Sequence, residues 1–89
     1  MTDRAQPLRV LFFAALRDQV GVAQIDLPID QICSLDVVLG QLRERIPAAA
    51  FAQLCAENVR IALNQELITV PVACGPGDEL AFLPPVTGG

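Results

Sequence analysis

Two segments near the ends of the chain, residues 8–13 and 79–83, alternate between faces with the period of a β-strand. Each places large apolar side chains on one face: Leu8, Val10 and Phe12 in the first segment, Leu80 and Phe82 in the second. Apolar residues also occupy the opposite face of both segments, which is typical of strands at the centre of a sheet. Weaker alternation predicts three shorter strands, at residues 24–27, 59–63 and 67–70.

A longer segment between these strands follows the period of an α-helix. Ser34 can cap its first turn and Pro47 ends it, which predicts a helix over residues 34–46. Its apolar positions form a single stripe: Leu35, Val38, Leu39, Leu42 and Ile46. Two shorter helical segments are predicted at residues 14–20, followed by Gly21 in the position of a C-terminal cap, and at residues 48–57.

The order of these elements is strand, strand, main helix, strand, short strand, strand. The amphipathic helix must bury its stripe, and a mixed sheet offers a face on which to bury it. A β-grasp fold of the α+β class satisfies this order, with the first and last strands side by side at the sheet centre. We therefore predict one β-grasp domain over residues 1–83, packed on one main helix.

A short tail, residues 84–89, follows the last predicted strand. Pro84 has no amide hydrogen, so strand pairing is expected to stop there, and Pro85 keeps the chain extended. Gly88 and Gly89 lack a Cβ atom and can enter a narrow channel. We predict an extended, flexible tail that reaches about 20 Å. A frayed terminus without a role is the alternative.

Composition narrows the chemistry of the domain. The chain has 89 residues and a net charge of −4, and all six of its cationic side chains are arginines. This charge argues against nucleic-acid binding. Because His and Lys are absent, His-based catalysis, an internal Schiff base and a lysine acceptor for isopeptide bonds are excluded.

Three cysteines remain as candidate reactive groups, and their spacing is wide: Cys33, Cys55 and Cys74. No C-x-x-C pair or His completes a metal site, so we expect no bound metal and three reduced thiols in a cytoplasmic protein. The longest apolar run, residues 10–16, is too short to span a membrane, and the N-terminus lacks a positive signal region.

The remaining reactive group is the carboxylate of Gly89, which is ionised at neutral pH and a poor electrophile. Activation by ATP to an acyl-adenylate would change that. A sulfur nucleophile would then give a thiocarboxylate, and an amine would give an amide. The domain would thus carry a group while partner enzymes supply the catalysis.

Three stretches of the sequence resemble those of a known protein family. They are RVLFFAxLR at residues 9–17, NQxL at residues 64–67, and GDELAFLPPVTGG at residues 77–89. The chain resembles the ubiquitin-related sulfur carriers that form the small subunit of molybdopterin synthase, the MoaD-like family. The last stretch is the most specific, whereas residues 24–57 match only in pattern.

The resemblance implies a cycle centred on Gly89. An E1-like adenylyltransferase would use ATP to adenylate its carboxylate, and a sulfur donor would convert it to a thiocarboxylate. The tail, with Thr87 and a sterically required Gly88, would insert into the large subunit of the synthase. There it would donate sulfur to cyclic pyranopterin monophosphate. The implied assembly is a heterotetramer of two small and two large subunits, and the small subunit binds no cofactor itself.

Docking of such a partner requires a surface near the root of the tail. Phe13 and Leu83 alternate off the core face, and Leu67 follows the predicted turn at residues 64–66. We predict that these three residues, with Pro84 and Pro85, bind the partner. The alternative is that Phe13, Leu67 and Leu83 are ordinary core residues.

Three other functions fit the same features. The chain could carry sulfur for thiamine or cysteine synthesis, it could be a ubiquitin-like modifier joined to lysines, or it could be a β-grasp binding module with an inert tail. The Phe-Leu-Pro-Pro-Val-Thr type of ending, here residues 82–87, favours the pterin pathway over the other sulfur pathways.

Overall fold

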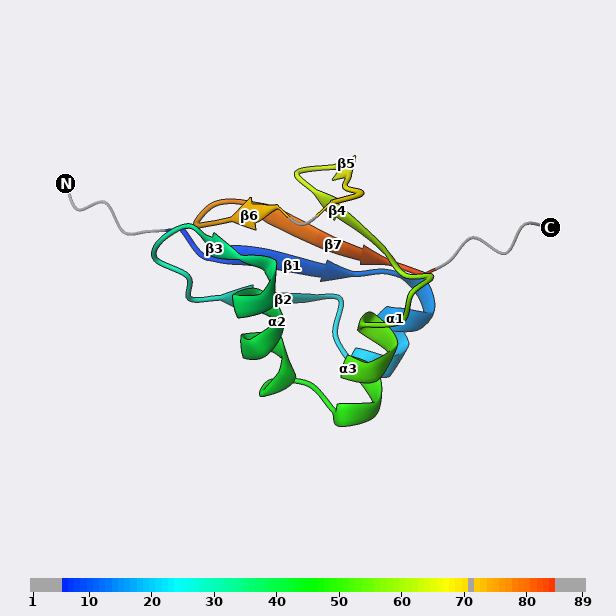
Figure 1. Cartoon of the computed structure of the whole chain (residues 1–89). Coiled ribbons are helices and arrows are strands. Elements are labelled where there is room, and N and C mark those ends of the chain that lie inside the picture. The colour runs from blue at the N-terminus through cyan, green and yellow to red at the C-terminus, as the bar shows by residue number, and fades with distance from the viewer. Residues whose placement is uncertain (1–5, 71, 85–89) are drawn as a thin grey trace.

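The computed structural model describes residues 6–70 and 72–84 and has a five-stranded mixed sheet with helices on one face (Figure 1). The strand order of this sheet is β2-β1-β7-β4-β5, and β3 and β6 form a second, two-stranded sheet. The elements run in the order β1 (Leu8–Phe12), α1 (Ala14–Val20), β2 (Gln24–Leu27), β3 (Cys33–Ser34), α2 (Leu35–Arg43), α3 (Ala48–Leu54), β4 (Arg60–Leu63), β5 (Glu66–Leu67), β6 (Ala73–Cys74) and β7 (Glu79–Leu83).

The first and last long strands lie side by side at the centre of the sheet. β1 and β7 are parallel, with Val10 opposite Leu80 and Phe12 opposite Phe82. β2 flanks β1 and β4 flanks β7, both in antiparallel pairing. The predicted β-grasp arrangement and its central strand pair are therefore confirmed.

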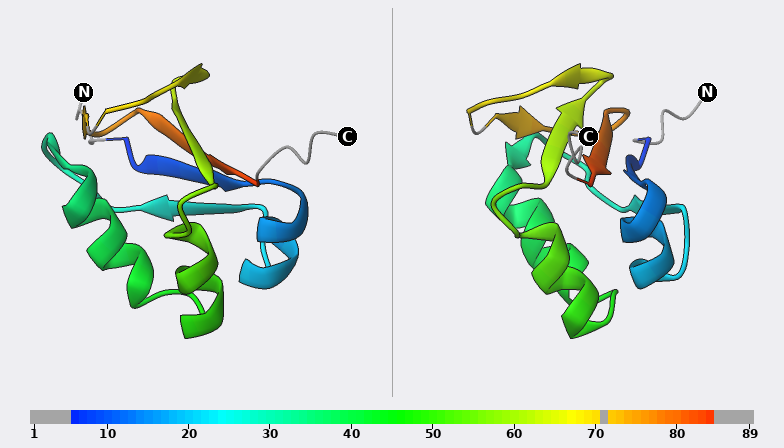
Figure 2. Two further views of the ribbon diagram at one scale, coloured as in Figure 1. Left: turned by 45° about the vertical axis from the view of Figure 1, so that its right-hand side comes forward. Right: turned by 90° about the vertical axis from the view of Figure 1, so that its right-hand side faces the viewer.

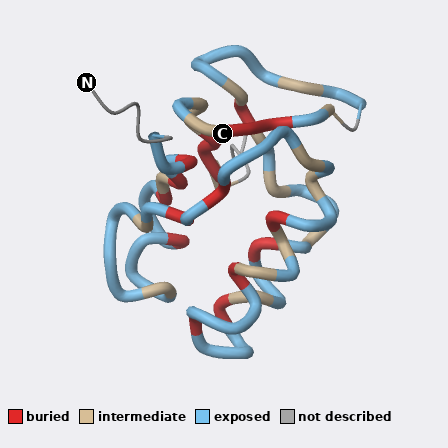
Figure 3. The backbone as a smooth tube through the Cα atoms, turned by 90° about the vertical axis from the view of Figure 1, so that its left-hand side faces the viewer, coloured by how far each residue is buried: buried red, intermediate tan, exposed pale blue. Residues whose placement is uncertain are grey.

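The core lies between the sheet and the helices, which Figure 2 shows on the same side of it. Phe12 and Phe82 stack within this layer, with ring centroids 5.9 Å apart. From α2, Val38 and Leu42 are fully buried, as their stripe predicts. Figure 3 shows the buried positions on the strands and helices where they face each other. Burial of this stripe against the sheet is the main source of stability for α2.

The main helix is shorter than its apolar stripe. Ser34 caps it as predicted, its Oγ accepting a hydrogen bond from Val37 N at 3.3 Å, but the helix ends at Arg43. Pro47 disfavours helical angles at Ile46, so the chain leaves the helix through a turn while Ile46 stays buried. The helix predicted over residues 48–57 likewise ends early, at Leu54.

The strand predicted at residues 67–70 is wrong in its bounds. Asn64 and Gln65 have φ angles of +51° and +73° and form a two-residue turn, so β5 begins at Glu66. The β3–β6 pair was not predicted, because two-residue strands leave no alternating pattern to detect. No described helix is long and apolar enough to cross a bilayer.

Candidate docking surface

The sheet face turned away from the helices carries an apolar row across four strands. The register places Leu11 beside Ala81, Ala81 beside Ala62, and Ala62 beside Leu67. Directly paired residues project to the same face, so these four side chains form a continuous outer row. Leu67 is 61% exposed, whereas the two alanines are buried. Leu67 is therefore a surface residue and not part of the core.

A second row lies closer to the C-terminal end of β7. Phe13 follows β1 in an extended conformation, and its amide donates to the Phe82 carbonyl at 3.3 Å, which places it beside β7. Its side chain is 44% exposed. Leu83 is half-buried and pairs with Arg60 of β4. We call Phe13, Leu83 and Arg60 the tail-root row. The predicted exposure of Phe13 is confirmed, and partner contact stays a prediction.

The turn after Phe13 holds this side chain at the edge of the sheet. Ala14, the first residue of α1, has φ of +52°, a left-handed value that costs a residue with a Cβ atom about 1 kcal/mol. The Phe13 carbonyl accepts hydrogen bonds from Leu16 N and Arg17 N, at 3.1 and 3.4 Å. The chain therefore passes from β1 into α1 within one residue, and Phe13 stays on the outer face.

The two arginines of the outer face have different surroundings. Arg9 pairs in register with Asp26 on one side and Glu79 on the other, so carboxylates flank it. Arg60 pairs with Leu83 and has Ala81 as its diagonal neighbour. Both of these neighbours are apolar, so no carboxylate flanks Arg60 in the sheet register. Arg60 is therefore a cation among the apolar side chains of the tail-root row.

A polar cluster fixes the hairpin that carries Leu67. Asn64 Nδ2 donates to Asp78 Oδ1 at 3.1 Å, and Asn64 Oδ1 accepts from Glu79 N at 3.0 Å. Asp78 Oδ2 accepts from Gly75 N at 2.8 Å. These bonds tie the β4–β5 turn to the start of β7. Asp78 is therefore a turn cap, and the cluster positions Leu67 in the outer row.

The predicted tail begins where the described chain ends. Pro84 is half-buried and follows Leu83 outside the strand. Because β1 and β7 are parallel, the end of β7 lies at the same edge of the sheet as Phe13 (Figure 1). Pro85, Thr87, Gly88 and Gly89 lie outside the described residues, so their roles stay predictions.

None of the three cysteines is bonded to another: Cys33 is half-buried, Cys55 exposed and Cys74 buried. Their reduced state stays a prediction. Burial raises the pKa of the Cys74 thiol, and the nearby Cys33 and Asp78 raise it further. Within residues 6–70 and 72–84, no group of three or more His, Cys, Asp or Glu side chains could hold a metal ion.

Sequence reasoning missed several members of the docking surface: Leu11, Arg60, Ala62 and Ala81. All four occupy the outward positions of predicted strands, so alternation alone could have placed them on this face. Their alignment into rows depends on the registers of β1, β7, β4 and β5, of which the Asn64–Gln65 turn fixes only that between β4 and β5.

Comparison with protein families gives one match across most of the chain. The ThiS family matches residues 10–89. The molybdopterin synthase sulfur carrier subunit of Haemophilus influenzae is 40% identical over 82 residues, covering 92% of this chain and 99% of its own. The protein of the same name from Escherichia coli is 34% identical, again covering 92% of this chain and 99% of its own.

Comparison with solved structures supports the fold. SAMP1 from Haloferax volcanii superposes with a TM-score of 0.76 at 25% identity, covering 92% of this chain and 98% of its own. The small archaeal modifier protein 1 from Methanosarcina acetivorans gives a TM-score of 0.73 at 22% identity, covering 98% of this chain and 100% of its own. The fold is therefore the ubiquitin-like β-grasp.

Proposed function

Because this chain belongs to the ThiS family, we propose that it is a sulfur carrier, and specifically the small subunit of molybdopterin synthase. The observation that carries this proposal is the similarity to relatives of that name along nearly their whole length. The family match extends to residue 89, so it includes the glycine pair on which the chemistry depends.

In the proposed cycle the Gly89 carboxylate is the reacting group. An oxygen of the carboxylate attacks the α-phosphorus of ATP on an E1-like adenylyltransferase, and pyrophosphate leaves. Hydrosulfide then attacks the acyl carbon, which releases AMP and a proton and leaves a thiocarboxylate. When the donor is a persulfide, an acyl disulfide forms and a thiol reduces it to the thiocarboxylate.

The thiocarboxylate then gives its sulfur to cyclic pyranopterin monophosphate on the large synthase subunit. Its C–S bond breaks, and water returns an oxygen to the acyl carbon, which regenerates the carboxylate. This chain has no His or Lys for general base or Schiff-base catalysis. The partners therefore supply the catalytic side chains, and ATP is consumed by the activating enzyme.

We propose that the partner binds to the tail-root row and the outer row. Phe13 and Leu67 are exposed large hydrophobic residues, and exposed apolar side chains in a cluster are typical of protein interfaces. Leu83 and Pro84 continue this surface toward the tail. We propose that the large subunit covers these residues in the assembly of two small and two large subunits, with Thr87, Gly88 and Gly89 in its active site.

The test is the intact mass of this protein after incubation with the adenylyltransferase, ATP and sulfide. One sulfur in place of one oxygen at Gly89 is the expected result. The matched control lacks Gly89 and should stay unmodified yet folded. An unchanged mass with an active enzyme would overturn the carrier proposal. Transfer of the sulfur to a thiazole or amino-acid acceptor, and not to the pterin, would overturn the assigned pathway.

A second candidate is a ubiquitin-like protein modifier. The similarity to SAMP1 at 25% identity favours it, since the homologous archaeal proteins are called small archaeal modifier proteins. A modifier would form an amide between Gly89 and an amine of a target. Covalent ladders on other proteins after co-expression with the activating enzyme would support this candidate.

A further inference from the structure

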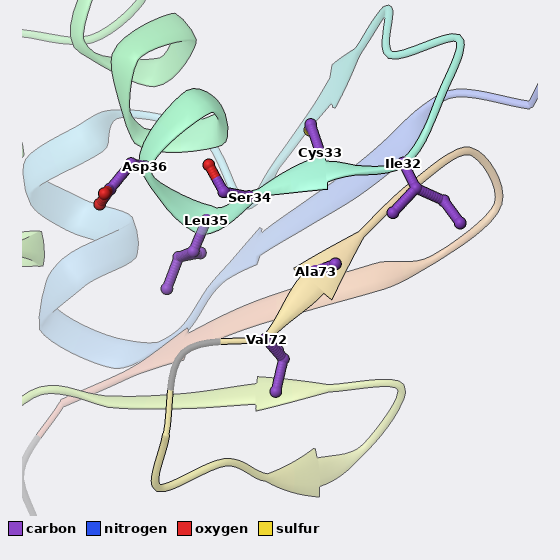
Figure 4. A pocket seen from close by; sticks show the side chains of 7 residues that line it. All are labelled: Ile32, Cys33, Ser34, Leu35, Asp36, Val72 and Ala73. Atoms are coloured by element: carbon purple, nitrogen blue, oxygen red, sulfur yellow. The ribbon is translucent and has the colours of Figure 1, made fainter.

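The short β3–β6 sheet brings two of the three cysteines together. Its strands are antiparallel, with Cys33 directly opposite Cys74 and Ser34 opposite Ala73. Figure 4 shows the two strands side by side, with Cys33 on β3. The two cysteines are 41 positions apart in the sequence, so only the folded chain creates this pair.

The geometry of directly opposite residues suits a disulfide. In an antiparallel pair the Cα atoms of opposite residues are about 4.5 or 5.5 Å apart, depending on the hydrogen-bonding position. Disulfides span Cα separations of about 4.4–6.8 Å, so either position is within range. Opposite side chains project to the same face, and the nearby Cys33 is one cause of the raised pKa of the Cys74 thiol.

The two thiols differ in access. Cys74 is 1% exposed and belongs to the core, whereas Cys33 is half-buried. Cys33 also lines a cavity of about 540 Å³, together with Ile32, Leu35 and Val72 (Figure 4). Cys33 is thus the more accessible of the two thiols, so a small disulfide reagent reacts there first, and the paired Cys74 is the resolving thiol.

We propose that Cys33 and Cys74 form a redox modification site, at which a low-molecular-weight disulfide such as oxidised glutathione converts the dithiol to an intramolecular disulfide. The site is separate from the Gly89 chemistry and does not depend on the proposed sulfur-carrier function.

The reaction proceeds by two thiol–disulfide exchanges. The Cys33 thiolate attacks one sulfur of oxidised glutathione, the S–S bond breaks, and one reduced glutathione leaves. The Cys74 thiolate then attacks the Cys33 sulfur of the mixed disulfide and releases the second glutathione. The protein loses two electrons and two protons, and one glutathione disulfide becomes two thiols.

The crosslink would tie β3 to β6 and close a long loop of the chain. A bond between positions far apart in sequence restricts the unfolded chain and stabilises the fold. The loop contains α2, α3, β4 and β5, so oxidation would tie the two ends of this segment together. Reduction would release this constraint.

The test uses the full chain with Cys55→Ser, which removes the exposed third thiol. After incubation with oxidised glutathione, we expect a monomer lighter by two hydrogens, a peptide crosslink between residues 33 and 74, and Tm raised by at least about 5 °C. Excess reductant should reverse all three changes.

The matched control adds Cys33→Ser to the same background and should show neither the crosslink nor the rise in Tm. Cys33 is the better position for this control because Cys74 is buried, and a Cys74→Ala variant checked for folding by circular dichroism serves as the second. A stable glutathione adduct on Cys33 without closure, or dimers linked through either cysteine, would overturn the proposal.

Discussion

Phe12 and Phe13 are adjacent in the sequence but lie on opposite faces of the sheet. Phe12 stacks on Phe82 at a centroid distance of 5.9 Å and an interplanar angle of 17°, deep in the core. Phe13 is 44% exposed on the tail-root row. Successive residues of a β-strand project to opposite faces of the sheet. Phe12 therefore stabilises the core, whereas Phe13 is accessible to a partner.

Alanine substitutions at these two positions separate the effect on stability from the effect on partner binding. Phe12→Ala should lower the free energy of unfolding by about 3–5 kcal/mol, because it opens a cavity in the core. Phe13→Ala should change it by less than about 1 kcal/mol but weaken binding of the large subunit at least about tenfold. Urea unfolding and titration with the partner measure the two effects. Full partner affinity in a folded Phe13→Ala protein would contradict the docking assignment.

The Asn64–Gln65 turn should respond oppositely to two neighbouring substitutions. Asn64→Ala removes the hydrogen bonds to Asp78 and Glu79 and leaves an alanine at φ of +51°, which we expect to destabilise the fold by about 1–3 kcal/mol. Gln65→Gly suits φ of +73° and should raise stability by about 0.5 kcal/mol.

Chemical denaturation of both variants in parallel checks these signs. Leu67 follows the turn by two residues, so Asn64→Ala should also weaken partner binding, whereas Gln65→Gly should leave it unchanged. Equal stability of the two variants would show that the polar cluster does not hold the hairpin.

The sequence predicted those elements whose side-chain pattern is long enough to have a period. The central strands, the stripe of α2 and the exposed position of Phe13 all follow from alternation or helical spacing. The β-grasp topology then follows from the need to bury one amphipathic helix on one sheet.

What the sequence did not predict depends on contacts between distant segments. The β3–β6 pair, with Cys33 opposite Cys74, arises from tertiary packing of two-residue strands. The position of Arg60 beside Leu83 depends on the register of β4 against β7, which no local pattern contains. The early end of α2 reflects competition between an apolar stripe and the proline that follows it.

Stability should fall at alkaline pH because of Cys74. Burial raises the pKa of this thiol above its ordinary value of 9.0, so the native state keeps the proton longer than the unfolded state does. The contribution is fully present below pH 9.0 and is lost as pH rises through the native pKa. The free energy of unfolding should therefore decline above this pH, by at most about 1.4 kcal/mol per pH unit from this group.

The chain has no His, Lys or Tyr, so cysteine thiols are the side chains that titrate in this range, and a Cys74 variant isolates the contribution of Cys74. Urea unfolding under reductant between pH 7 and 11 gives the slope. Cys74→Ala should be less stable throughout but show a shallower decline. The same slope in both proteins would assign the alkaline loss to another group.

Arg60 should govern how strongly the docking surface attracts its partner. It is the cation of an otherwise apolar tail-root row on a chain of net charge −4, so we expect the partner to place a carboxylate opposite it. Arg60→Glu should weaken binding of the large subunit by about tenfold or more, mainly through slower association.

The matched control is Arg45→Glu, on the exposed turn after α2, which changes the net charge equally and should have little effect. Association rates at two salt concentrations separate a local pair from net charge, and equal losses in the two variants would refute a specific role for Arg60.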